Sequence, residues 1–244
     1  MKKHFIIVCF LFLFGSFWGN AQGLNEIELS DAWKAKIEQN SPKHTTIKTS
    51  KKRKILLFSL YTGFQHWVIP HTSQIIKTLA GKTDAFEIVE TTDIQLFSKN
   101  NLKKFDAVIL NNTCSKGDNR NIFLDVLMED KTLSEADQKA KAAELEGNLI
   151  NYVAKGGGLM LLHGGIVMQN KSSKFGEMAG GSFDYHPVQQ NIDVKLVNPN
   201  HPLVAAFEGE GFSHIDEPYF FNNAYFNYNF RPLLYMEEDH GSLL

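Results

Sequence analysis

Four short clusters along the chain combine histidines, carboxylates, glycines and aromatic residues in patterns that could do chemistry. They are Tyr61-Thr-Gly-Phe-Gln-His66, Leu162-His163-Gly164-Gly165, Gly180-Gly-Ser-Phe183-Asp-Tyr-His186-Pro187 and His214-Ile-Asp216-Glu217-Pro-Tyr219. Each follows a strand-like run or a turn, where α/β folds place their ligands. We therefore expect their side chains to converge on one site.

His163 stands where an apolar run meets two glycines. This pattern predicts a sharp turn from strand to helix, at which Gly164 and Gly165 would let a substrate approach the backbone N–H groups. Such elbows carry Ser or Cys when they supply a nucleophile, and imidazole is a poor substitute in acyl transfer. We expect His163 to act as a ligand or as an acid/base, with a purely structural turn as the alternative.

The other three clusters supply partners for His163. Gly63 permits a tight turn that would aim His66 at the cleft, unless His66 only caps the next helix. Pro187 holds the residue before it extended, which would aim His186. Asp216 and Glu217 could act as a general base or bind metal, or could simply be solvated. The predicted catalytic residues are His163, His66 and Glu217, and the predicted substrate-binding residues are Gly164, Gly165, Phe183, Asp216 and Tyr219.

The cofactor is left unknown, with a divalent metal such as zinc as the candidate. Its tentative ligands are His66, His163, His186 and Glu217, because three histidines and a carboxylate can hold zinc and acidify a bound water. Without metal, His163 would act as an acid/base. The chain has no H-E-x-x-H, C-x-x-C, P-loop or dinucleotide signature, so standard zincin, redox and nucleotide sites have no support.

The elements expected to position these clusters are buried strands and helices in alternation. Short apolar runs at 55–58, 86–89, 107–110 and 159–162 are typical of buried parallel strands. Helices are expected from Pro70 and over 134–155, the latter capped by Ser134 and stopped by three glycines at 156–158. The pattern predicts a doubly wound, mostly parallel α/β sheet with helices on both faces. The residues from 189 onward are expected to form a wall of the site and a sheet edge.

The composition fits a globular domain and disfavours a polyanionic partner. The chain has 244 residues, 43% of them hydrophobic and 21% charged, with a net charge of −2 and a pI near 6.5. Because no basic stripe is present, we expect no nucleic-acid partner. After removal of a leader, Cys114 is the lone cysteine, and we interpret it as a small buried hydrophobe.

The N-terminus is typical of a secretory signal peptide. Two lysines precede an apolar run over 5–18 and a small-residue stretch ending near Ala21, after which we expect cleavage. The run is short for a transmembrane helix, so a stable membrane anchor is the weaker interpretation. We therefore expect a secreted or periplasmic protein, with residues 1–21 as signal peptide, 22–53 as a polar lead-in and 54–244 as the main domain. The oligomeric state is left open.

The clusters together, with Asn111-Asn112-Thr113, Gly156 to Gly165 and His201-Pro202, resemble the trehalose-utilisation (ThuA-like) family over roughly residues 54–236. The resemblance implies a class I glutamine amidotransferase-like, flavodoxin-like three-layer fold. It also implies a role in sugar or glycoside metabolism. In the amidotransferases that share this fold the elbow carries a catalytic Cys; here His163 matches it, so glutaminase activity is disfavoured.

Family members continue into a further strand, a turn and a closing helix, so we expect the chain to be incomplete at its C-terminus. The leading hypothesis is an exported carbohydrate-processing enzyme acting on a small-molecule carbohydrate. The alternative is a non-catalytic periplasmic sugar-binding or accessory module. An enzyme should bring at least two of the histidines and a carboxylate together, whereas a module has no such need.

Overall fold

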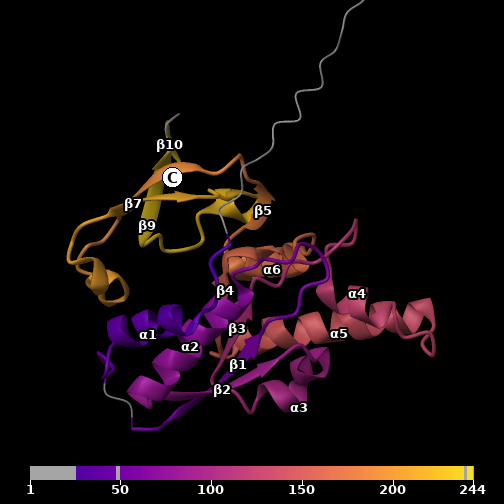
Figure 1. Cartoon of the computed structure of the whole chain (residues 1–244). Coiled ribbons are helices and arrows are strands. Elements are labelled where there is room, and N and C mark those ends of the chain that lie inside the picture. The colour runs from indigo at the N-terminus through magenta and orange to yellow at the C-terminus, as the bar shows by residue number, and fades with distance from the viewer. Residues whose placement is uncertain (1–25, 48–49, 239–240, 244) are drawn as a thin grey trace, which may run out of the picture.

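The computed structural model describes residues 26–47, 50–238 and 241–243. A parallel sheet flanked by helices forms its larger part, and a β-rich part formed by residues after 180 lies beyond one end of that sheet (Figure 1). The predicted signal peptide, residues 1–21, lies outside the described residues. In the part of the chain that is described, no helix is long and apolar enough to cross a membrane.

The central sheet has four parallel strands in the order β2-β1-β3-β4. Its strands are β1 (Arg53–Phe58), β2 (Phe86–Thr91), β3 (Ala107–Asn111) and β4 (Gly158–Leu162). Each contains one of the predicted apolar runs, so the α/β prediction is confirmed. The chain order reverses between β1 and β3, and folds of this kind bind ligands beyond the carboxyl ends of the strands at such a point.

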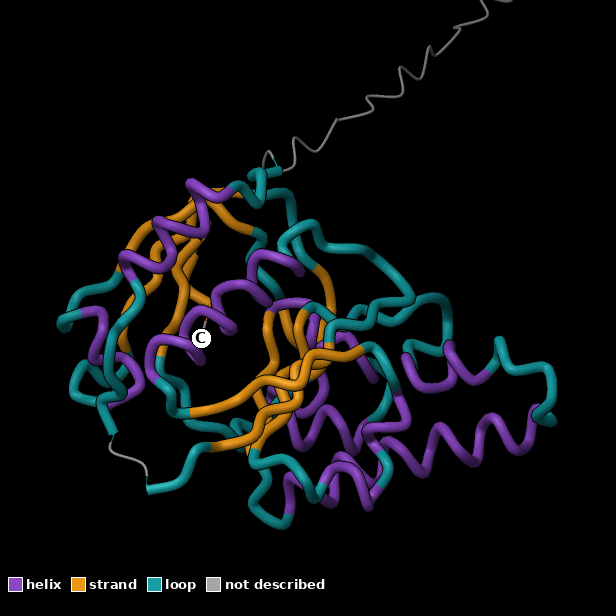
Figure 2. Tube along the Cα trace, turned by 60° about the horizontal axis from the view of Figure 1, so that its bottom comes forward, coloured by secondary structure: helices purple, strands orange, loops and turns teal. Residues whose placement is uncertain are grey.

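Helices cover both faces of this sheet (Figure 2). Leu56, Phe58 and Leu110 are fully buried in the core cluster that includes residues of α4 (Ile122–Leu127) and α5 (Glu135–Ala154). Asn111 points to the other face, where its Nδ2 donates to the carbonyl of Ile69 in α2 (Ile69–Thr83). The other described helices that follow β1 are η1 (Ile94–Phe97), α3 (Lys99–Leu102), η2 (His163–Gln169), α6 (Ser173–Ala179), η3 (Pro202–Phe207) and η4 (Asn223–Asn227).

The two helices expected from the sequence are present with the expected ends. Ser134 caps α5, since its Oγ accepts a hydrogen bond from the backbone N–H of Asp137 at 3.2 Å. The helix stops at Gly156, whose φ of 94° suits a residue without Cβ. Pro70 lies in the first turn of α2, where its missing N–H costs nothing.

The lead-in contains one helix, α1 (Asp31–Asn40), which packs on α2. Its Trp33 meets the ring of His71 edge-on at 4.9 Å, and Trp67 meets the same ring at 5.1 Å. His71 is therefore buried between two indoles, and neither of its ring nitrogens has a hydrogen-bond partner among the described residues.

The β-rich part forms its own sheet rather than an edge of the central one. An antiparallel sheet has the order β10-β9-β6-β7, and β5 pairs separately with β8. On β6, Asp193 and Lys195 are exposed while Ile192 is buried. This alternation is typical of a sheet with one face exposed to solvent. The strands are β5 (Ser182–Tyr185), β6 (Gln190–Leu196), β7 (Phe212–Asp216), β8 (Phe220–Asn222), β9 (Leu234–Glu238) and β10 (Gly241–Leu243).

Candidate functional site

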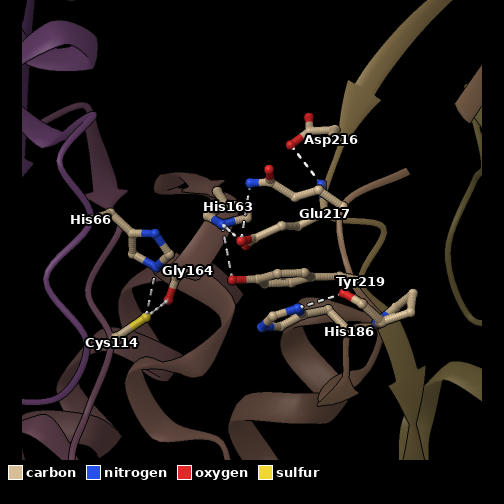
Figure 3. A network of polar contacts seen from close by, with 10 residues as sticks. His66, Cys114, His163, Gly164, His186, Asp216, Glu217 and Tyr219 are labelled. Carbon is tan, nitrogen blue, oxygen red and sulfur yellow. Dashed lines mark hydrogen bonds and ion pairs between the residues drawn. The ribbon is translucent and has the colours of Figure 1, made fainter. Parts of the chain in front are cut away.

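Loops at the carboxyl ends of three neighbouring strands meet the β-rich part at one place. His66 lies in the loop after β1, Cys114 follows β3, and His163 follows β4. Glu217 and Tyr219 come from the segment between β7 and β8 (Figure 3). The site therefore includes the β1/β3 reversal point, where ligand binding is expected in this architecture.

His163 has the backbone strain expected of an elbow. Its φ is 44°, a left-handed value that a non-glycine residue adopts only when its surroundings impose it. β4 ends at Leu162 and η2 begins at His163, so the imidazole stands at a sharp change of chain direction. The predicted strand-to-helix turn is present, and it aims His163 at the β-rich part.

The two glycines after His163 are required by packing, which differs from the predicted reason. A Cβ on Gly164 would lie 2.5 Å from Sγ of Cys114 and 3.0 Å from Nε2 of His66. A Cβ on Gly165 would lie 2.5 Å from the carbonyl oxygen of Leu110. Both residues are buried. Protein atoms therefore fill the direction in which a side chain would extend from each glycine, and the approach of a substrate to their N–H groups stays a prediction.

Nε2 of His163 is the centre of the polar contacts in Figure 3. The hydroxyl of Tyr219 lies 3.0 Å from it, and Oε2 of Glu217 lies 3.6 Å from it. The side chains of His163 and Glu217 are 32% and 28% exposed, so solvent reaches the pair only in part. An imidazole, a phenol hydroxyl and a carboxylate thus lie together in a site that is only partly exposed to solvent.

Burial sets the protonation state of this group. Desolvation lowers the pKa of His163 below 6.5, and it raises the pKa of Tyr219 well above its ordinary value of 10. At neutral pH the imidazole is therefore neutral and the phenol keeps its proton. A hydrogen bond from the Tyr219 hydroxyl to Nε2 of His163 requires the tautomer whose ring proton is on Nδ1.

Glu217 is held by its own neighbours. Nε2 of Gln189 lies 3.4 Å from Oε1 of Glu217, and Oδ1 of Asp216 accepts from the backbone N–H of Glu217 at 2.8 Å. Asp216 therefore fixes the local backbone, while Glu217 is the carboxylate that approaches His163. This resolves which member of the predicted acidic pair lies nearer the imidazole.

His66 lies beside His163 and touches Cys114. The two imidazole rings meet edge-on with centroids 4.7 Å apart, and Sγ of Cys114 lies 3.4 Å from Nε2 of His66. Desolvation, with the nearby His163, lowers the pKa of His66 to about 4, and burial raises the pKa of the Cys114 thiol to about 11. Both groups are therefore neutral at pH 7 and form no thiolate–imidazolium pair.

His186 and Phe183 contact the site through Tyr219. The ring of His186 is nearly parallel to that of Tyr219 at 5.7 Å, and Phe183 packs against Tyr219 at 4.6 Å. Nδ1 of His186 lies 3.0 Å from the carbonyl oxygen of Pro187, to which it donates. His186 is therefore placed as a support for the tyrosine ring.

The four tentative metal ligands do not form one metal-binding group. Among the described residues, no three His, Cys, Asp or Glu side chains are arranged to hold a metal ion. The ring of Tyr219 separates His186 from His163, and Nε2 of His66 faces Cys114 (Figure 3). The donors therefore do not fit the zinc site expected from His66, His163, His186 and Glu217.

Two contacts of this site could not be found in the sequence. Cys114 is buried as expected, with 5% exposure, but its sulfur also reaches His66 and, at 3.7 Å, the carbonyl oxygen of Gly164. Gln189 lies 28 positions before Glu217, and no motif marks it. Both contacts depend on how separate loops meet, which local patterns do not encode.

Comparison with known proteins identifies the family. The family model described as trehalose utilisation, ThuA, matches residues 54–240. The chain belongs to the ThuA family. No curated protein matches the chain.

Two solved structures are similar to this ThuA-family chain. A ThuA-like protein from Bacteroides uniformis ATCC 8492 has a TM-score of 0.56 at 18% identity, over 79% of this chain and 72% of that one. One from Parabacteroides merdae ATCC 43184 has a TM-score of 0.49 at 18% identity, with the same coverage. The first of these supports the shared fold.

Proposed function

We propose that this ThuA-family protein is a carbohydrate-processing enzyme that works by proton transfer at His163 and Tyr219. The 3.0 Å contact between the Tyr219 hydroxyl and Nε2 of His163 is the observation that supports it most directly. Acid–base catalysis needs a donor and an acceptor within hydrogen-bond reach, each in the protonation state its role requires. A carbohydrate is the substrate class suggested by the family, whose description is trehalose utilisation.

The pair suits an oxidised sugar, one that contains a carbonyl group. The carbonyl oxygen would replace Nε2 as the acceptor of the Tyr219 hydroxyl, which frees the lone pair of His163. Nε2 then takes the proton from the carbon next to the carbonyl, and the C–H electrons move into an enediolate whose oxygen receives the Tyr219 proton. His163 then returns its proton to the other carbon, while the hydroxyl on the first carbon gives its proton to the Tyr219 phenolate and becomes the new carbonyl. The product is the isomeric sugar and both residues regain their starting protonation state, so the step needs no further reactant.

Glu217 and His66 have supporting roles in this proposal. When His163 takes the proton it becomes cationic, and a carboxylate 3.6 Å from Nε2 favours that charge in a half-buried site. His66 is neutral at pH 7, because its pKa lies near 4. It therefore adds no competing positive charge beside His163.

The alternatives from the sequence fit these contacts less well. A binding module needs no group of titrating side chains, yet His163 contacts both His66 and Glu217. Glutaminase chemistry needs a cysteine nucleophile, but His163 occupies the elbow, and burial keeps the thiol of Cys114 protonated. Both observations favour an acid–base enzyme.

Turnover of disaccharides, monosaccharides and their keto forms tests this proposal. The purified protein is compared with His163→Asn and Glu217→Gln, and products are followed by NMR. His214→Asn is the control, because His214 is an exposed residue of β7. We expect a loss of about 100-fold or more in His163→Asn and unchanged turnover in the control. Equal turnover in His163→Asn and the unaltered protein would overturn the proposal.

We further propose that the protein is exported by an N-terminal signal peptide. Two lysines followed by an apolar run over 5–18 support it. Mass spectrometry of the N-terminus of the protein recovered from cell fractions tests this. A new N-terminus after Ala21 is expected, and an uncleaved chain in the cytoplasmic fraction would contradict it.

A further inference from the structure

A large aromatic cavity lies next to the proposed acid–base site. Its volume is about 810 Å³, within the range of small-molecule pockets. Its walls are supplied mainly by strands β5, β6, β8 and β9, together with η4 and the loop that follows it. Nothing in the proposed acid–base chemistry uses this space, so its occupant needs a separate explanation.

The surface of the cavity is mainly apolar, although Asp184 and five tyrosines are among its lining residues. Ile192, Val194 and Met236 contribute aliphatic side chains, and the aromatic lining residues include Tyr185, Phe220, Phe221, Tyr225 and Phe230. Several of these rings already lie nearly parallel to one another, with Tyr225 and Phe230 at 5.3 Å and Tyr185 and Phe220 at 4.6 Å. A flat, apolar ring system is the chemistry that such walls accept best.

The cavity is open to solvent and is not a closed part of the core. Phe226 and Tyr228, which also line it, are 67% and 59% exposed. Clustered exposed aromatic residues on a soluble domain commonly mark a place where something binds.

Tyr219 joins the cavity to the acid–base site. Tyr219 is one of the lining residues of the cavity, and its hydroxyl contacts Nε2 of His163 at 3.0 Å. A molecule whose sugar reaches that hydroxyl would therefore direct its substituent along the tyrosine ring into the aromatic space.

We infer that the substrates of this enzyme are glycosides with an aromatic aglycone, which occupies the cavity bounded by Tyr219, Phe221 and Val194. This inference rests on the proposed function. A second sugar ring fits the cavity less well, because most of the surface of its walls is apolar and its hydroxyls would lose more contacts with water than Asp184 and the tyrosine hydroxyls can replace. An aryl group has few hydrogen bonds to water to lose when it enters the cavity, and burial of its apolar surface favours binding.

Calorimetric binding of phenyl β-glucoside and methyl β-glucoside tests the inference without any need for turnover. The two ligands share the sugar, so the ratio of their dissociation constants reports the aryl group alone. We expect phenyl β-glucoside to bind about tenfold or more tightly. The variant Val194→Trp, which fills the cavity, should remove that preference. Lys195→Trp is the control, because the neighbouring residue of β6 is exposed and does not line the cavity.

The other possible results distinguish failure of the aryl site from failure of the acid–base mechanism. Equal binding of the two glucosides overturns the inference and leaves the proposed acid–base function intact. If Val194→Trp fails to fold, contacts from the phenyl protons to the methyl groups of Val194 and Met236 are sought by NMR in the unaltered protein, and their absence overturns it. A dimer in solution that covers Phe226 and Tyr228 and does not discriminate between the ligands would instead assign the cavity to a contact between copies. Preferential binding together with full turnover in His163→Asn would retain the aryl site and reject the acid–base mechanism.

Discussion

The hydroxyl of Tyr219 lies 3.0 Å from Nε2 of His163, although 56 positions separate the two residues in the chain. His163 stands at the end of a strand of the parallel sheet, and Tyr219 comes from the β-rich part that follows. The contact therefore forms only when the two parts of the domain are packed together. Any change that loosens this packing should weaken the acid–base pair before it disturbs either sheet.

Replacing Tyr219 by Phe removes the proton donor and keeps the ring. We expect kcat to fall by about 100-fold or more, because a positioned acid contributes at least that much, while KM changes little. Steady-state kinetics on a substrate of the enzyme checks this. Tyr152→Phe is the matched control, since its hydroxyl donates only to the carbonyl of Phe105 and its loss should cost about 1 kcal/mol of stability without affecting kcat. An unchanged kcat in Tyr219→Phe would contradict the assigned role.

The free energy of unfolding should depend on pH through His66. Burial lowers its pKa from 6.5 to about 4, so between these values the unfolded chain binds a proton that the folded protein does not. The contribution of His66 to the free energy of unfolding is largest above pH 6.5. It decreases as the pH is lowered towards 4 and is constant below pH 4. Solvent screening keeps the effect below that of a fully buried histidine.

Urea unfolding at several pH values between 7 and 4 measures this dependence. The carboxylates also titrate in part of that range, so the comparison is between the unaltered protein and His66→Gln. The slope of stability against pH should be smaller in the variant. Identical slopes would show that His66 titrates normally in the folded protein.

Gly164 should not tolerate a side chain. In Gly164→Ala the new methyl group would lie 2.5 Å from Sγ of Cys114, so we expect a loss of about 1–3 kcal/mol in stability together with reduced turnover. Adding Cys114→Ala should restore part of both. Gly147→Ala is the control, since nothing lies within 4 Å of its added Cβ in α5, and it should be neutral or stabilising. Chemical denaturation of the unaltered protein, the two single variants and the double variant measures these changes. If Gly164→Ala were as stable as Gly147→Ala, the packing argument would be wrong.

Removal of divalent metals should leave the His163-dependent turnover unchanged. Among the described residues no three metal-binding side chains converge, and Nε2 of His163 is already in contact with the Tyr219 hydroxyl. Activity before and after dialysis against a chelator checks this, together with elemental mass spectrometry of both samples. Loss of activity that returns with zinc would restore the metal interpretation.

The fold was predictable from the sequence because its core elements have local signals. The parallel strands are continuous apolar runs, and α5 has a cap at Ser134 and a stop at Gly156. The elbow at His163 was predictable for the same reason, since an apolar run and two glycines lie next to each other in the sequence. Such signals depend only on neighbouring residues.

The arrangement within the site was less predictable, because it depends on how distant segments pack. His186 was expected among metal ligands, but the segment between β7 and β8 places the ring of Tyr219 between it and His163. The packing of Gly164 against Cys114 was not predicted, because the two residues are 50 positions apart in the sequence. The separate antiparallel sheet was also missed, because alternation in a single strand does not specify which strands it pairs with.

Exchange of solvent deuterium into a keto-sugar measures the proposed proton transfer most directly. Keto-glucosides are incubated in D₂O with the unaltered protein, with His163→Asn and with His214→Asn, and NMR follows the hydrogen next to the carbonyl. The proposed mechanism predicts rapid exchange with the unaltered protein and with His214→Asn, and a rate near the uncatalysed value with His163→Asn. Equal exchange in all three proteins, or none above the uncatalysed rate in any, would contradict it.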